Sequence, residues 1–160
     1  MKYLNVIATS VLFFSLVSCS KDNPTSKSPS SQATKPTVIN LTQVGCQFLE
    51  TEAKNHQYKP KKAEDCKKIN SETLATRKSE FQSLDLKPGK YIFRVTNSNV
   101  PYDLGFWLRG TGIKKVGLPK ISGGGLTQGI TKDYEIELKA GEYVFSCPLN
   151  PTPDYPITVS

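Results

Sequence analysis

Short segments in which hydrophobic and polar residues alternate recur along the chain from residue 37 onwards. In the segments 91–95, 134–138 and 143–147 every second residue is hydrophobic. A period of two residues is typical of a β-strand with one buried face. The segments 37–41 and 155–159 have a similar composition and predict an opening and a closing strand. The pattern therefore predicts an all-β domain.

Some of these segments belong to an internal repeat, because residues 84–95 align with residues 136–147 at a constant offset of 52 (136 − 84). Each copy contains a strand, a Lys-Pro-Gly or Lys-Ala-Gly turn, and a second strand with two aromatic residues. Glycine in such a turn permits a tight reversal. Two matching corners favour a sandwich of two sheets.

Helix is predicted only once, from a cap at Asn70 and Ser71 to about Phe81. The preceding stretch, residues 54–68, carries six lysines against Glu64 and Asp65. Two interpretations stay open for it: a solvated surface insertion, or a contact site for an anionic partner. The glycine run 122–125 lacks the Gly-Lys-Ser/Thr ending of a phosphate loop and predicts a flexible connection between sheets.

The N-terminus has the pattern of a secretion signal. Met1 and Lys2 precede an apolar run, residues 4–17, which is shorter than the ~20 residues of a membrane span. The run ends in Leu-Val-Ser-Cys, which resembles a bacterial lipobox. This predicts a signal peptide over 1–18 and a palmitate-carrying Cys19 that anchors the protein in the cell envelope, on the periplasmic side of the outer or plasma membrane. The alternative is an ordinary signal peptide with a chance cysteine.

Composition divides the remainder into a tether and one domain. Residues 19–35 are rich in Ser, Thr, Pro and Lys, which predicts a flexible tether, and residues 36–160 form the folded domain. The net charge of +7 does not by itself indicate nucleic acid, and we expect no such partner. His56 is the only histidine, which excludes sites with several imidazoles and leaves no Ser-His-Asp arrangement to argue. We therefore expect no enzymatic activity and no small-molecule substrate.

Cysteine usage indicates one disulfide. Of the four cysteines, Cys19 is assigned to the lipid, and Cys46 and Cys66 flank the basic stretch. Their pairing closes a loop of 21 residues (66 − 46 + 1) and contributes about 3 kcal/mol. Cys147 is then a free thiol, which we interpret as a small buried residue because it takes the position of Val95 in the internal repeat.

The C-terminal half resembles a cupredoxin of the plastocyanin or azurin type. Residues 141–150 and 155–159 resemble the last two strands of that family, and residues 95–103 resemble its strand and loop before the first copper ligand. The resemblance covers about residues 84–160. It implies a Greek-key β-sandwich, to which the sequence adds a short helical, disulfide-closed insertion.

The resemblance fails at the copper ligands. Cys147 takes the thiolate position, but Tyr102 and Asn150 replace the two imidazoles and Tyr155 replaces the methionine. Blue-copper sites need both imidazoles beside the thiolate, so we expect no metal cofactor. The family presents the loops around its metal to partners, which makes these four positions a candidate partner face.

These observations predict a non-catalytic cell-envelope lipoprotein. Its copper-free cupredoxin-like domain would serve as a binding or assembly module, with the membrane and an envelope protein as partners. The alternative is a copper-binding or redox protein that transfers electrons through Cys147.

Overall fold

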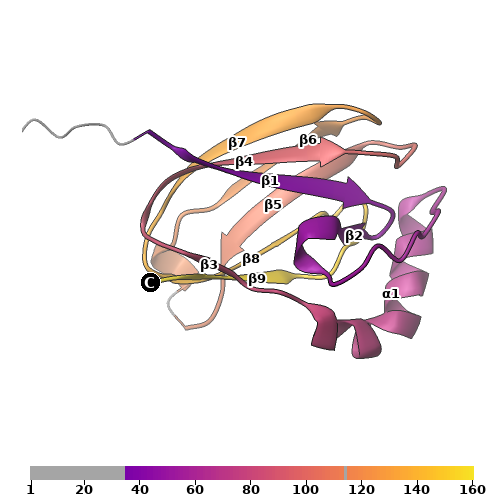
Figure 1. Cartoon of the computed structure of the whole chain (residues 1–160), viewed down its shortest axis with the longest axis horizontal. Helices are drawn as coiled ribbons and strands as arrows, with labels where there is room; N and C mark the ends of the chain where they lie inside the picture. The colour runs from indigo at the N-terminus through magenta and orange to yellow at the C-terminus, as the bar shows by residue number, and fades with distance from the viewer. Residues whose placement is uncertain (1–34, 114) are drawn as a thin grey trace, which may run out of the picture. The chain divides into compact units, whose positions relative to one another are not determined.

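A computed structural model describes residues 35–113 and 115–160, which form two β-sheets packed face to face (Figure 1). The predicted signal peptide, Cys19 and most of the tether lie outside these residues. One sheet has the order β2-β1-β4-β7 and the other the order β3-β9-β8-β5-β6. The strands are β1 (Thr37–Val44), β2 (Gln47–Phe48), β3 (Leu84–Leu86), β4 (Gly89–Asn97), β5 (Leu104–Gly110), β6 (Ile121–Leu126), β7 (Thr131–Leu138), β8 (Gly141–Ser146) and β9 (Tyr155–Val159).

The prediction of an all-β Greek-key sandwich is confirmed, and all five predicted strands are present. Strand β1 pairs with β4 in parallel, and β3 pairs with β9 in parallel. The other pairings within the sheets are antiparallel. Figure 1 shows that the chain enters β1 at one end of the sandwich and that helix α1 (Ala63–Arg77) lies at the other.

The internal repeat forms two equivalent corners, at each of which the chain passes from one sheet to the other. In the first, the Tyr91 hydroxyl donates a hydrogen bond to the carbonyl oxygen of Lys87 at 2.8 Å. In the second, the Tyr143 hydroxyl donates to the carbonyl oxygen of Lys139 at 2.9 Å. Each hydroxyl also accepts the N–H of the same lysine at 3.2 Å. The repeat in sequence is therefore a repeat of corner geometry.

An aromatic cluster forms the centre of the core between the sheets. Phe106 packs against Phe93, Tyr134 and Phe145, with ring centroids 5.7, 5.0 and 5.9 Å away. Phe48 packs edge-on against Phe145 at 5.0 Å. Phe48 belongs to β2 and Phe145 to β8, so this contact holds the short strand β2 against the second sheet.

The start of the helix was predicted at the wrong residue. Helix α1 starts at Ala63, seven residues before the predicted Asn70 (70 − 63), and continues into a 3-10 turn over Lys78–Glu80. The Asp65 carboxylate caps it by accepting the N–H groups of Lys61 and Lys62 at 2.7 and 3.2 Å. These backbone hydrogen bonds, of which that from Lys61 is stronger, lower the pKa of Asp65. Asn70 instead accepts a hydrogen bond from Arg77 at 2.6 Å.

The prediction of a flexible connection at 122–125 is also wrong, because these residues lie in β6 and pair with β5. A Cβ atom at Gly123 would lie 2.8 Å from the Tyr134 ring, so glycine permits the close approach. The Tyr134 hydroxyl donates to the Gly123 carbonyl at 3.4 Å, and Lys132 donates to that of Gly124 at 2.8 Å. Side chains of β7 thus cover carbonyl groups of this edge strand. No helix among the described residues is long and apolar enough to cross a membrane.

Candidate functional site

Three of the four positions that resemble copper ligands meet at the end of the sandwich near α1. Cys147 and Asn150 belong to the loop after β8, which we call the cysteine loop (residues 147–154). Tyr102 lies on the loop between β4 and β5. The turn between β1 and β2 and the first turns of α1 complete the site, and they are joined by the Cys46–Cys66 disulfide. The predicted disulfide pairing is therefore confirmed.

Asn150, which the sequence resemblance aligns with an imidazole ligand, links all of these segments. Its side chain is fully buried. Its Oδ1 accepts the Cys46 N–H at 3.2 Å and the Tyr102 hydroxyl at 3.1 Å. Its Nδ2 donates to the Val44 carbonyl at 2.9 Å, and its Oδ1 lies 3.2 Å from the Cys66 sulfur. Both ends of the amide are thus used in holding the protein together.

Cys147 is buried, with 1% of its surface exposed. Its Sγ accepts the N–H of Gly105 at 3.3 Å and the N–H of Asn150 at 3.2 Å. Burial raises the pKa of the Cys147 thiol, although the backbone hydrogen bonds act in the opposite direction. The thiol is therefore protonated at neutral pH, and the interpretation of Cys147 as a buried structural residue agrees with this geometry.

Tyr102, the third residue of this group, is half-buried. Burial, and secondly the charge that Cys147 would carry, raise the pKa of Tyr102 to about 12. A phenol with this pKa stays protonated at neutral pH and donates its hydrogen bond to Asn150.

The structure separates Tyr155 from this network. Its hydroxyl donates to the Glu52 carboxylate and accepts the Phe48 N–H at 3.4 Å. Burial and the neighbouring charge of Glu52 raise the pKa of Tyr155. Tyr155, Asn150 and Cys147 are each no more than 1% exposed. The prediction that these positions form a partner face is therefore wrong for all three, and Tyr102 alone reaches the surface.

A buried charged cluster beside Tyr155 has no counterpart in the sequence predictions. Arg77 binds Glu52 through two hydrogen bonds, at 2.6 Å from Nη2 and 3.0 Å from Nε. The Arg77 side chain is 2% exposed and that of Glu52 is fully buried. His56 Nε2 lies 3.0 Å from Glu52 Oε2, and its ring stacks on Tyr58 with centroids 5.3 Å apart. We call residues 49–83, between β2 and β3, the insertion. The cluster fastens this insertion to the sandwich through the hydrogen bond between Glu52 and Tyr155.

The donor set at the cysteine loop does not fit a blue-copper centre. Such a centre needs two imidazole nitrogens beside a thiolate. Here the Asn150 amide is engaged at both ends, the Tyr102 phenol is protonated, and His56 faces Glu52. In the described part of the chain, no three His, Cys, Asp or Glu side chains are grouped in a way that could hold a metal.

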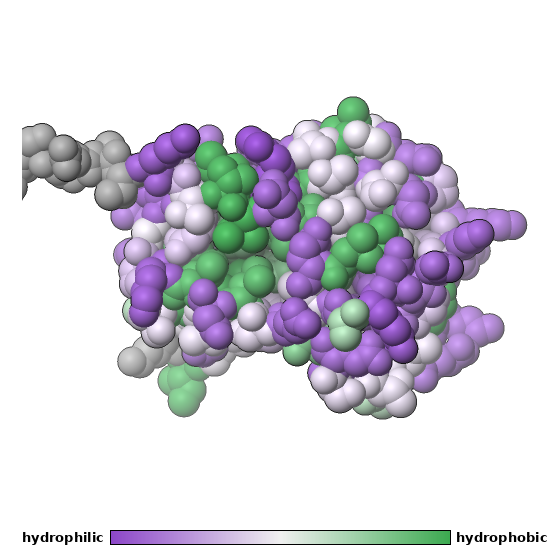
Figure 2. Space-filling model, viewed as in Figure 1, coloured by the Kyte–Doolittle hydropathy of each residue, from purple (hydrophilic) through white to green (hydrophobic). Residues whose placement is uncertain are grey.

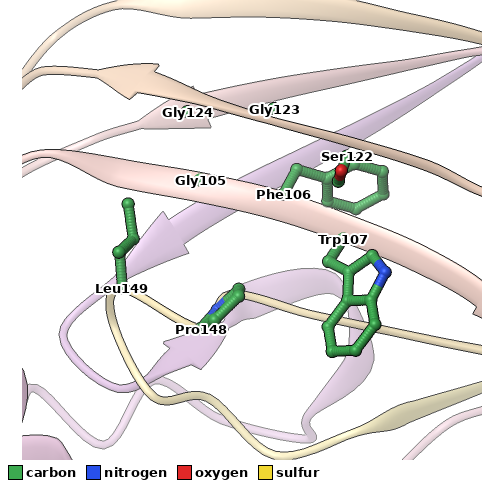
Figure 3. Close-up of a pocket in the computed structure, with 8 residues that line it drawn as sticks. All are labelled: Gly105, Phe106, Trp107, Ser122, Gly123, Gly124, Pro148 and Leu149. Carbon is green, nitrogen blue, oxygen red and sulfur yellow. The ribbon is translucent and has the colours of Figure 1, made fainter.

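A shallow cavity of about 280 Å³ lies beside the cysteine loop, between Pro148 and Leu149 on one side and strands β5 and β6 on the other (Figure 3). Trp107 is 39% exposed at its rim. The Arg109 guanidinium covers one face of that ring, 3.8 Å from its centroid, and binds both carboxylate oxygens of Asp154 at 2.7 Å. The indole is therefore covered on one face and open to solvent elsewhere.

Comparisons with known proteins give weak similarities only. No family model matches the chain, and no curated protein matches it significantly. Among solved structures it is similar to the dithionite-reduced auracyanin of Roseiflexus castenholzii (13% identity, TM-score 0.45, 78% of this chain and 97% of that one). It is also similar to a multi-copper oxidase of Pediococcus acidilactici (9% identity, TM-score 0.39, 81% of this chain and 27% of that one). Similarity at this level says nothing about the chemistry of this chain.

Proposed function

We propose that this protein is a non-catalytic cell-envelope lipoprotein whose copper-free, cupredoxin-like domain is a binding or assembly module. The observation that supports this best is the state of Asn150. This residue, which aligns with a copper ligand, is fully buried, and both ends of its amide form hydrogen bonds, to Val44, Cys46 and Tyr102. The end of the sandwich is thus built for rigidity, which suits a surface that meets a partner without rearranging.

The alternative is a copper-binding or redox protein that uses Cys147. It has less support, because a thiol that is 1% exposed and has a raised pKa is a poor metal ligand and a poor nucleophile. Electron transfer through Cys147 would also need the two missing imidazoles.

Copper loading separates the two functions. The mature protein is incubated with Cu(II), desalted, and examined by visible absorption and metal analysis beside a Cys147→Ser variant. We expect both proteins to be colourless and to lose surface copper to a mild chelator. An intense visible band in the parent protein that disappears in Cys147→Ser would replace the binding module with electron transfer.

A further inference from the structure

A second concave surface lies at the same end of the domain and meets the Asn150 network only at Val44, whose carbonyl oxygen accepts the Asn150 amide. Its main cavity, about 340 Å³ in volume, lies between the segment 58–61 of the insertion and the loop 99–101. A second cavity of about 280 Å³ adjoins it and shares Tyr58, Lys59 and Asn99 as lining residues. We call the two together the lysine pocket. Its main cavity has the size of a small-molecule site.

The insertion wall of the lysine pocket is fixed in place. A Cβ atom at Gly45 would lie 2.3 Å from the Tyr58 carbonyl oxygen, so this wall presses directly onto the β1–β2 turn. Gln47 holds the preceding residues by donating to the Lys54 carbonyl at 3.0 Å and accepting the His56 N–H at 2.8 Å. The opposite wall is also fixed, because Asn97 both donates to the Val100 carbonyl and accepts its N–H, at 3.0 and 2.9 Å.

The polar groups that line the pocket are free to bind a ligand. Lys59 and Lys61 are exposed, and neither ammonium group forms an ion pair within the described ranges. The side-chain amides of Gln57 and Asn99 are exposed too, and no hydrogen bond to another described residue involves them. Ammonium groups attract carboxylates and phosphates, whereas amides bind hydroxyl groups as donors and acceptors.

The surrounding charge favours the same ligand. Figure 2 shows a predominantly hydrophilic surface over the α1 end of the domain. Between residues 53 and 79 the exposed acids are Glu64 and Glu72, against these exposed lysines: Lys54, Lys59, Lys61, Lys62, Lys67, Lys68 and Lys78. An excess of one sign around a concave site raises the local concentration of a ligand of the opposite sign.

We infer that the lysine pocket binds an acidic saccharide, a sugar whose ring carries a carboxylate or a phosphate beside its hydroxyl groups. This inference rests on the proposed binding function and gives it a ligand class. The acid group lies between Lys59 and Lys61, and the hydroxyl groups meet the amides of Gln57 and Asn99. Because the eight residues of β1 span about 26 Å, the pocket is presented far from the point where the chain enters the domain.

The test is calorimetric titration of the mature protein with trigalacturonate and glucose 1-phosphate, which separates carboxylate from phosphate, and with neutral galactotriose. We expect binding of at least one acidic sugar, none of the neutral one, and weakening by added salt. Lys59→Gln with Lys61→Gln should weaken binding about tenfold or more, since two charge-assisted contacts are lost. The matched control, Lys67→Gln with Lys68→Gln, removes the same charge from exposed helix positions and should change affinity less than about threefold.

Four results would overturn the inference that the lysine pocket binds an acidic saccharide. They are no binding of either acidic sugar, binding of galactotriose as tight as that of the acidic sugars, equal weakening by the two pairs of lysine substitutions, and binding of an oligoglutamate as tight as that of the acidic sugars. Because all four lysines are exposed, we expect both double variants to fold with almost unchanged stability, which their melting curves measure. These results are independent of copper loading, which examines Cys147. If the protein is colourless after copper loading and binds no acidic sugar, the proposal for the lysine pocket fails while the copper-free assignment stands.

Discussion

Replacing Arg77 by Met should be among the most destabilising single substitutions in the domain. Arg77 donates two hydrogen bonds to Glu52 and a third to Asn70. Without the guanidinium, the Glu52 carboxylate stays fully buried with only the Tyr155 hydroxyl and His56 as polar neighbours. Leaving one charge of a buried pair uncompensated costs about 3–5 kcal/mol. We expect a loss of that size in the free energy of unfolding at pH 7.

The chain supplies a matched control for this experiment. Arg94 also binds a carboxylate with two hydrogen bonds, both at 2.8 Å to Asp133, but its side chain is 46% exposed. Because water screens this pair, Arg94→Met should cost less than about 1 kcal/mol. The double variant Glu52→Gln with Arg77→Met should recover part of the loss, since the unpaired charge is removed as well.

Urea unfolding followed by fluorescence of Trp107, the only tryptophan, measures all of these variants. If Arg77→Met costs no more than Arg94→Met, burial does not set the strength of the pair and the reasoning fails. A double variant less stable than Arg77→Met alone would show that the lost packing of the Arg77 stem, rather than the unpaired Glu52 charge, dominates.

Three further outcomes are expected. Iodoacetamide at pH 8 should label Cys147 only after unfolding, because the thiol is buried and its pKa is raised; rapid labelling of the native protein would contradict this. The pKa of Tyr102 is raised from its ordinary 10 to about 12, so the contribution of Tyr102 to the stability of the fold is fully present below pH 10 and is lost as the pH rises toward 12. Tyr102→Phe should therefore reduce the fall in melting temperature between pH 10 and pH 12. Cys19→Ala should abolish fatty-acid labelling and release the protein from membranes, and continued labelling would refute the proposed anchor.

Patterns with a short period predicted the strands well, because alternation states directly which face of a strand is buried. Residues 155–159 also alternate, with Tyr155, Ile157 and Val159 at every second position, although this was not used in the prediction, and the structure buries all three. The partner-face prediction went wrong when the ligand position in the family was given more weight than this alternation. A resemblance locates a residue along the chain, whereas the period decides which way its side chain points.

The remaining errors come from contacts that no period records. Helix α1 buries only Cys66 and Arg77, so no apolar stripe marks where it begins. Its start is set by the Asp65 carboxylate, which bonds to backbone N–H groups that precede the helix. Glu52 and Arg77 are 25 residues apart and joined only by the way the insertion folds back. The cysteine pair was predictable because disulfides form in secreted proteins and the sequence carries a secretion signal.

The contacts of Asn150 and Tyr155 also impose an order of events on the folding chain. Asn150 reaches back 104 and 106 residues to Cys46 and Val44, and Tyr155 reaches back 103 residues to Glu52. The disulfide, by contrast, spans a separation of 20 and can close early. Contacts at such long range slow folding, because the entropy of loop closure is lost before they form. An oxidised insertion therefore gains these contacts only after the last strand has formed, and a chain that ends before the cysteine loop lacks them.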